Sequence, residues 1–307
     1  MPPWTAADIP NLAGRTVIVT GATGGIGWHT ALELARRGAR TVVAGRDPDK
    51  AEAAAASIRA RTGPRTTVQA APLDLADLAS VRRFTARFLA DHDGLDVLVN
   101  NAGVMAIPRE LTADGFERQL GTNHLGHFAL TGLLLSALLA RPGARVVTVS
   151  SSLYASGRVD FDDLMGERNY GQLRAYNQSK LANVLFAFEL QRRADAVGAA
   201  LASVVVHPGV ARTNLAHTGG PVRAVLLRLM RLTAQTPAEA ARSSLFAATT
   251  PDIHGGEFIA PGGPGQRSGH PTRIVPDERA RDTATASRLW TVSQELTGVR
   301  FTAFDRA

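Results

Sequence analysis

Residues 16–27 read TVIVTGATGGIG, and this stretch decides the fold of the chain. Five β-branched residues predict a buried strand, and the glycine-rich run after them predicts a tight turn. The apolar residues that follow recur at helical spacing as far as about residue 37, which predicts a helix. A strand, a glycine turn and a helix in this order are typical of nucleotide-binding α/β proteins.

The glycine turn suits a phosphate group. Glycines let the backbone approach a pyrophosphate closely, and the free N–H groups at a helix start attract an anion. Glycines also serve plain tight turns, so the turn alone leaves both interpretations open. The spacing of Gly21, Gly25 and Gly27 also differs from the G-x-G-x-x-G dinucleotide pattern. The flanking strand and helix favour the nucleotide interpretation.

The alternation of strand and helix continues along the chain. Further strands are predicted at residues 41–44, 66–72, 95–99, 144–149, 203–206 and 258–259. Further helices are predicted at about residues 48–61, 77–90, 114–139, 175–190, 237–248 and 276–296. This rhythm predicts an α/β fold, a single doubly wound Rossmann domain over residues 1–307 with a mostly parallel sheet flanked by helices on both faces.

The composition limits the possible functions. Of the 307 residues, 45% are hydrophobic and 20% are charged, which is ordinary for a soluble globular protein. The net charge of +7 is spread along the chain, so we expect a solvated arginine-rich surface and no nucleic-acid partner. The absence of cysteine excludes disulfides, thiolate catalysis and cysteine metal sites, and we expect no metal.

Three segments bear on location. Residues 1–12 lack the basic start and apolar core of a secretory signal. Residues 125–140 are broken by His127 and fall short of the ~20 residues of a spanning helix. Residues 213–235 carry an apolar stripe with arginines outside it, which predicts a lid over an apolar pocket. Such a stripe could also contact a membrane surface, the less favoured alternative, so we expect a cytoplasmic protein.

The ends of the second and third predicted strands bear on cofactor choice. In nucleotide-binding folds the second strand ends at the adenosine ribose, where an acidic residue selects NAD and an arginine accepts a 2′-phosphate. Gly45 offers no carboxylate and Arg46 supplies a cation, which favours NADP over a merely solvated loop arginine. Asp74, after the third strand, could hold its loop or meet the adenine edge.

Tyr176 and Lys180 are the strongest candidates for chemistry. A spacing of four residues places both side chains on one face of a helix. Of the 34 basic residues only Lys50 and Lys180 are lysines, so a lysine at this point suggests a need for a compact ammonium. An ammonium close to a phenol could make the tyrosine acidic.

Together with these two residues, several motifs resemble the short-chain dehydrogenase/reductase family, in the family's order and over nearly the whole chain. They are Thr20-Gly21-x-x-x-Gly25-Ile26-Gly27, Asn100-Asn101-Ala102-Gly103, Asn123, Ser151, Tyr176-x-x-x-Lys180 and Pro208-Gly209. Within the family, the excursion before Tyr176, the turn at residues 44–47 and the Leu289-Trp290 tail resemble the branch of retinol dehydrogenases, the WW-domain oxidoreductase and protochlorophyllide reductase.

The resemblance implies a role for each catalytic residue. Tyr176 would be the general acid/base that exchanges a proton with a carbonyl oxygen during hydride transfer. Lys180 would favour the phenolate and hold the nicotinamide ribose. Ser151 would bond the substrate oxygen, with Ser150 as the alternative among three adjacent serines. Asn123 would carry a water that links Lys180 to solvent.

The resemblance also implies NADP(H) as cofactor. Its contacts would be Gly21, Thr23, Gly24, Gly25, Ile26, Gly27, Arg46, Asp74, Leu75, Asn101, Ala102, Gly103, Tyr176, Lys180, Pro208, Gly209, Val210 and Thr213. The expected partner is a small, rather apolar carbonyl or alcohol. Two alternatives stay open, a catalytically silent NADP-binding sensor or scaffold and a carbon–carbon double-bond reductase. The apolar helices near residues 125–139 and 181–190 could pair in a homodimer or homotetramer, or bury themselves within one chain.

Overall fold

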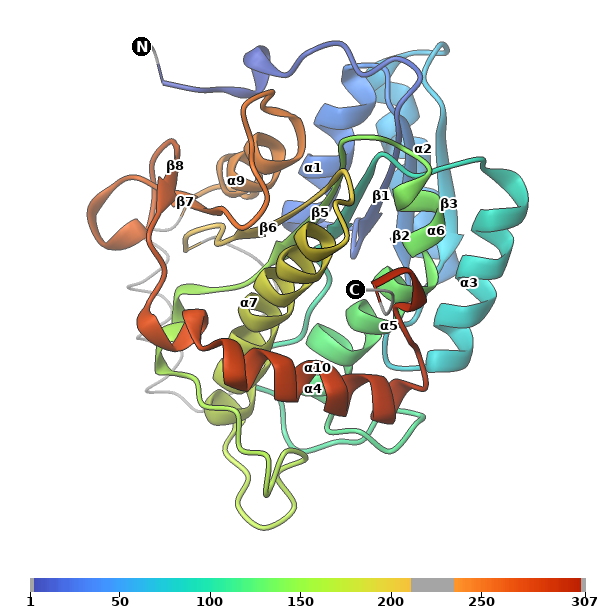
Figure 1. Cartoon of the computed structure of the whole chain (residues 1–307). Coiled ribbons are helices and arrows are strands. Elements are labelled where there is room, and N and C mark those ends of the chain that lie inside the picture. The colour runs from blue at the N-terminus through green and yellow to red at the C-terminus, as the bar shows by residue number, and fades with distance from the viewer. Residues whose placement is uncertain (1–2, 211–234, 305–307) are drawn as a thin grey trace.

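The predicted α/β sheet is confirmed in a computed structural model, which describes residues 3–210 and 235–304. These residues form one eight-stranded sheet in the order β3-β2-β1-β4-β5-β6-β7-β8 (Figure 1). The strands are β1 (Thr16–Thr20), β2 (Arg40–Gly45), β3 (Val68–Pro72), β4 (Val97–Asn100), β5 (Ala144–Val149), β6 (Leu201–Val206), β7 (Phe258–Pro261) and β8 (Pro271–Ile274). Neighbouring strands run parallel except β7 and β8, which are antiparallel. Thr213 and nearly all of the expected lid lie outside the described residues.

Helices cover both faces of the sheet, as predicted. Their bounds are α1 (Gly25–Arg36), α2 (Pro48–Thr62), α3 (Leu78–Asp91), α4 (Arg118–Leu120), α5 (Gly126–Leu133), α6 (Leu135–Leu139), α7 (Gln172–Ala196), α9 (Pro237–Thr249) and α10 (Thr283–Thr297). One face is covered by α1, α2 and α9, and the other by α3, α5 and α7 (Figure 1). Strands buried between two helical layers are largely apolar, and every residue of β1 and β4 is buried, including the polar Thr20 and Asn100 at their carboxyl ends.

The structure differs from the sequence prediction at three elements. The strand at 258–261 is not the last, because β8 follows it at the edge of the sheet. No residue of β8 is fully buried, so it lacks the apolar pattern by which strands are predicted. The helix expected over residues 114–139 is broken into several pieces, and the last helix starts at residue 283 rather than about 276.

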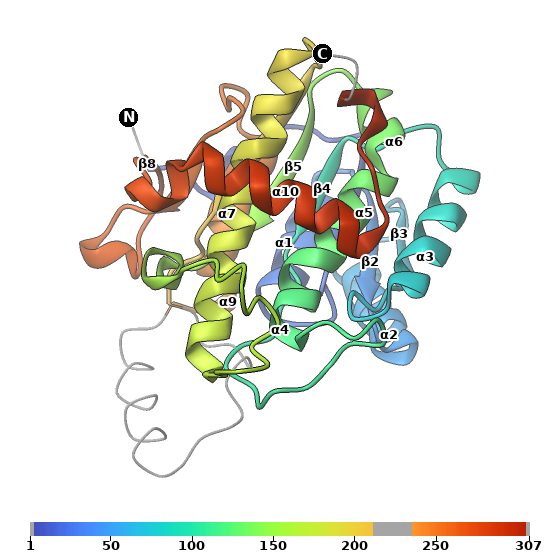
Figure 2. The same ribbon diagram turned by 60° about the horizontal axis from the view of Figure 1, so that its bottom comes forward.

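The C-terminal helix α10 lies across the outer side of α7 and α5 (Figure 2). Its Trp290 is 2% exposed and packs on Phe128, Phe186 and Phe301, at ring-centroid distances of 5.2, 5.9 and 4.4 Å. These parts of the two apolar helices are therefore buried within their own chain. Within the described residues, no helix is long and apolar enough to cross a membrane.

We expect Trp290→Ala to destabilise the protein by roughly 3–5 kcal/mol, the usual cost of truncating a buried large aromatic side chain. Denaturant unfolding followed by circular dichroism measures the loss. Glu295→Ala, at an exposed position of the same helix, is the control and should change stability by no more than about 0.5 kcal/mol. Equal losses in both variants would contradict the packing role of Trp290.

Candidate active site

The glycine turn after β1 has the geometry of an anion cradle. Gly24 is the N-cap of α1 and provides no side-chain cap, so the first N–H groups of the helix are left for another acceptor. Gly21 and Gly25 adopt φ values of +64° and +56°, which favour glycine. A Cβ at Gly27 would lie 2.5 Å from the carbonyl oxygen of Gly21, so helix and turn are in close contact. The turn therefore fits a pyrophosphate.

A second turn, at residues 101–103 after β4, is held against the first by Thr20. The Thr20 hydroxyl accepts hydrogen bonds from the backbone N–H groups of Asn101 and Ala102 at 2.9 and 3.0 Å. The amide of Asn101 donates to the Thr20 carbonyl at 2.7 Å. The motif comparison included Thr20, but the sequence did not show that its hydroxyl is the point where both turns meet.

The end of β2 presents one free cation. Arg46 is exposed, and its guanidinium makes no hydrogen bond or ion pair with residues 3–210 or 235–304. The neighbouring carboxylate of Asp47 is occupied, since it caps α2 through the Lys50 N–H at 3.1 Å and pairs with the Lys50 ammonium at 3.0 Å. A Cβ at Gly45 would lie 2.5 Å from a methyl carbon of Thr23, so a side chain at that point would require the exposed Thr23 side chain to move away.

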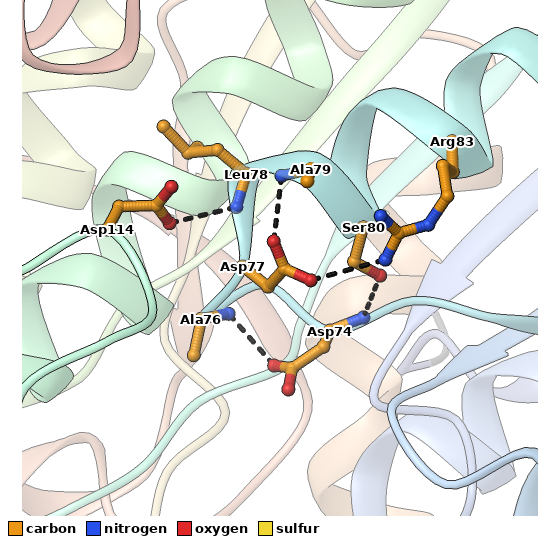
Figure 3. A network of polar contacts seen from close by, with 8 residues as sticks. All are labelled: Asp74, Ala76, Asp77, Leu78, Ala79, Ser80, Arg83 and Asp114. Carbon is orange, nitrogen blue, oxygen red and sulfur yellow. Dashed lines mark hydrogen bonds and ion pairs between the residues drawn. The ribbon is translucent and has the colours of Figure 1, made fainter.

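The loop after β3 is organised by two aspartates (Figure 3). Asp74 accepts a hydrogen bond from the Ala76 N–H at 2.9 Å, so one of its oxygens holds the loop. Asp77 is the N-cap of α3 and accepts from the Ala79 N–H. Leu75 is 5% exposed and belongs to the core, and its carbonyl lies so close to Gly126 that a Cβ there would be 2.3 Å away.

Asn123 lies in a π-helical turn (Gly121–Leu125) between α4 and α5. Its side chain accepts from the Val104 N–H at 2.8 Å and donates to the Val104 carbonyl at 2.9 Å. It also donates to the Ser179 hydroxyl at 2.9 Å. The amide thus fixes the segment after the second turn to α7. Single π-turns of this kind are frequent at functional sites.

Tyr176 and Lys180 lie buried in the first turns of α7, each 4% exposed. The ammonium of Lys180 is 5.7 Å from the centre of the Tyr176 ring and donates to the Val149 carbonyl at 3.1 Å. The Ser151 side chain is close enough to the phenol of Tyr176 to affect its ionisation. The Ser150 hydroxyl instead donates to the Lys180 carbonyl at 2.8 Å.

Burial acts on both charges of this pair. It raises the pKa of Tyr176 to about 12, while the interaction with the Ser151 side chain acts in the opposite direction. Burial also lowers the pKa of Lys180 to about 8. In the protein alone, therefore, the pKa of the phenol is not lowered as the spacing of the pair suggested, because removal from water penalises the phenolate.

The segment after β6 closes the same edge of the sheet. Gln235 clamps it by donating to the carbonyls of Pro208 and Arg267 at 3.1 and 3.0 Å, and the Val210 N–H also donates to Arg267. His207 accepts from the Ser152 N–H at 3.2 Å, so it joins this segment to the serine run after β5. No sequence signal pointed to Gln235, because its partners are distant in the chain.

The described residues expected at the site thus gather along the carboxyl edge of the sheet. A Cβ at Gly103 would lie 3.1 Å from the Asn123 amide oxygen and 3.6 Å from the Lys180 ammonium, which brings the second turn, the π-turn and α7 together. Open α/β sheets bind their ligands at this edge. Fold and site define a protein of the doubly wound, dinucleotide-binding class.

Comparison with known proteins narrows this class. The family model described as short chain dehydrogenase matches residues 15–221. Human retinol dehydrogenase 12 is 44% identical over 292 residues, covering 94% of this chain and 88% of the relative. Mouse polyprenol dehydrogenase is also 44% identical, covering 94% of this chain and 86% of the relative. The chain therefore belongs to the short-chain dehydrogenase family, in its retinol dehydrogenase branch.

Solved structures agree with this assignment. A crystal structure of an uncharacterised protein from Mycobacterium paratuberculosis is 44% identical with a TM-score of 0.81, covering 97% of this chain and 99% of that one. A protein from Beutenbergia cavernae, assigned as an NAD(P)-dependent gluconate 5-dehydrogenase with bound NADP at low occupancy, is 29% identical with a TM-score of 0.63 and coverage of 80% and 94%. The chain is thus an oxidoreductase of alcohol or carbonyl groups with a nicotinamide cofactor.

Two glycine variants test the cradle. A Cβ at Gly24 meets no atom within 4 Å, whereas a Cβ at Gly27 lies 2.5 Å from Asn101 and Gly21. We expect Gly27→Ala to lower the free energy of unfolding by about 1–3 kcal/mol, the usual cost of overpacking. Gly24→Ala should cost less stability, because its methyl group meets no protein atom, and should weaken nicotinamide cofactor binding, because Gly24 is the N-cap beside the uncapped N–H groups of α1. Thermal melts and NADPH fluorescence titrations measure both, and unaltered binding in Gly24→Ala would contradict this location of the cofactor.

Proposed function

We propose that the protein is an NADP(H)-dependent oxidoreductase that interconverts a carbonyl and an alcohol of a small apolar molecule, with Tyr176 as general acid/base. The observation that carries the proposal is the buried Tyr176–Lys180 pair, whose phenol lies close to Ser151 beside the glycine-rich turns. Such an arrangement can place a proton and a substrate oxygen at one point.

Ser151 suits the role of substrate-oxygen ligand better than Ser150. Ser150 is 2% exposed, and its hydroxyl already donates a hydrogen bond to the Lys180 carbonyl. The Ser151 hydroxyl contacts the Tyr176 phenol, so a substrate oxygen could bond to both groups at once. In the reductive direction Tyr176 gives its proton to that oxygen, and in the oxidative direction it takes the proton back.

The cofactor supplies the hydride chemistry. When bound, NADP(H) would give or accept the hydride, and its oxidised ring carries a positive charge that favours the phenolate. Lys180 supports the same ionisation of Tyr176, since its buried ammonium lies on the same helix face. Asn123 holds the backbone beside Lys180, and the proton relay through a water at this residue stays a prediction.

Cofactor selection rests on the end of β2. The free guanidinium of Arg46 is available for a 2′-phosphate, whereas Asp47 is engaged by Lys50 and Gly45 carries no side chain. These contacts support NADP over NAD. An apolar substrate is supported by the partly exposed Val104, Met105 and Leu153, which lie on segments of the site, and by the names of the retinol and polyprenol dehydrogenases.

Replacing Tyr176 by Phe should lower kcat by about 10²- to 10⁴-fold, the usual contribution of a general acid/base, and leave NADPH binding within about twofold. Turnover is followed as NADPH oxidation against aldehydes, ketones, quinones and enones. Tyr154→Phe, which removes another buried phenol, one that bonds the Asp277 N–H, is the control and should keep its activity. A tyrosine-independent reduction of enones alone would favour a double-bond reductase, and binding without any turnover in the wild type would favour a sensor.

Arg46→Asp should shift the ratio of kcat/KM for NADPH over NADH toward NADH by about 100-fold, because it removes a cation and adds a repelling carboxylate at the 2′-phosphate position. Arg65→Asp is the matched control. Arg65 is exposed and precedes β3, so it lies near the amino ends of the parallel strands, whereas Arg46 follows the carboxyl end of β2. An unchanged ratio in Arg46→Asp, or an equal shift in both variants, would show that Arg46 does not select the cofactor.

A further inference from the structure

His127 of α5 connects the two groups that hold the second turn. Its Nε2 lies 2.9 Å from the Thr20 hydroxyl, which bonds Asn101 and Ala102. Its Nδ1 lies 2.9 Å from the backbone carbonyl of Asn123, whose side chain accepts a hydrogen bond from the Val104 N–H. One buried imidazole thus joins the residue that holds the start of the turn to the residue that holds its end.

The hydrogen-bond partners fix where the protons of this network lie. A carbonyl oxygen only accepts, so Nδ1 of His127 carries a proton toward Asn123. The Thr20 hydroxyl already accepts two backbone N–H bonds, so its lone pairs are used and its own proton has to point outward. The nearer acceptor is Nε2 of His127 at 2.9 Å, since the Val99 carbonyl is 3.3 Å away. Every group is satisfied when the ring is neutral and protonated at Nδ1.

The surroundings keep the ring neutral. His127 is 1% exposed, and burial lowers its pKa to about 4. The charge of Lys180 on α7 lowers the pKa further, whereas the Asn123 carbonyl opposes the shift. His124, in the neighbouring π-turn, is also neutral at pH 7, because burial lowers its pKa to about 3. A second proton on His127 would point a donor at the Thr20 oxygen, which has no lone pair left for it.

We propose that His127 is a positioning residue that fixes the cofactor-facing turn at residues 101–103 relative to Asn123, and that it does so only as the neutral Nδ1–H tautomer. The kinetic consequences rest on the oxidoreductase function proposed above. The two hydrogen bonds have separate roles. The bond to Thr20 secures the turn against the cofactor, and the bond to Asn123 secures the π-turn beside Lys180.

Two substitutions separate the two bonds. His127→Asn puts an amide N–H near the place of Nδ1 and keeps the donor to Asn123, whereas His127→Gln puts a carbonyl oxygen near Nε2 and keeps the acceptor for Thr20. We expect His127→Asn to raise the KM for NADPH about tenfold with kcat within twofold, and His127→Gln to lower kcat about tenfold with that KM within twofold, as for one lost buried hydrogen bond. Equal changes of both constants in both variants would overturn the separation.

Ser203→Ala is the matched control. It removes an equally buried hydrogen bond, which the Ser203 hydroxyl of β6 donates to the Ala187 carbonyl of α7 at 2.8 Å, and which involves neither cofactor turn nor the π-turn. Its melting temperature should fall while both kinetic constants stay within twofold. If Ser203→Ala reproduces the kinetic changes of the His127 variants, those changes reflect general loosening and the proposal fails.

A second measurement does not depend on turnover. In ¹⁵N-histidine NMR spectra at pH 7, His127 should show a protonated Nδ1 and an unprotonated Nε2. Amide hydrogen exchange at Asn101 and Ala102 should become about tenfold faster in His127→Asn and stay unchanged in His127→Gln. A protonated Nε2, or exchange unchanged in both variants, would overturn the proposal. If tautomer and exchange are as expected but the wild type turns over no substrate, the positioning role stands and the proposed oxidoreductase function is what fails.

Discussion

The parallel alignment of β1, β4, β5 and β6 is the constraint on which the site depends. Parallel strands end at the same edge of a sheet, so the chain leaves all four at one place. There it forms the glycine turn, the second turn, the serine run and the segment after His207. The apolar strands buried between two helical layers hold this edge rigid, which lets loops far apart in the chain meet within hydrogen-bond distance.

Buried hydrogen bonds then convert this shared edge into a defined geometry. Thr20, Asn123 and Gln235 each link two segments, and their bonds run mainly to backbone groups, which do not change with the neighbouring side chains. Leaving a buried polar group without a partner costs free energy, so each of these contacts also favours one conformation of its loop. The site is therefore held from behind by polar side chains that point into the protein.

Burial also has an electrostatic cost for the Tyr176–Lys180 pair. The same removal from water that fixes Tyr176 and Lys180 disfavours the charged form of each. It also strengthens every charge interaction within the site, because little water remains to screen it. In such a site, a charge on a bound cofactor would strongly change the pKa values of the buried side chains. The local pattern Tyr-x-x-x-Lys does not show this effect of burial.

The sequence by itself determined the doubly wound fold. Strands buried on both faces appear in it as apolar runs, and the glycine turn appears as a run of glycines directly after the first strand. It also placed the candidate residues at strand ends. It did not reveal β8, the π-turn at Asn123 or the Thr20–His127 contact. An exposed edge strand has no apolar pattern, a π-turn differs from an α-turn by one hydrogen bond, and Thr20 and His127 are 107 residues apart. Only tertiary structure decides which buried polar groups meet, because that depends on packing between distant segments.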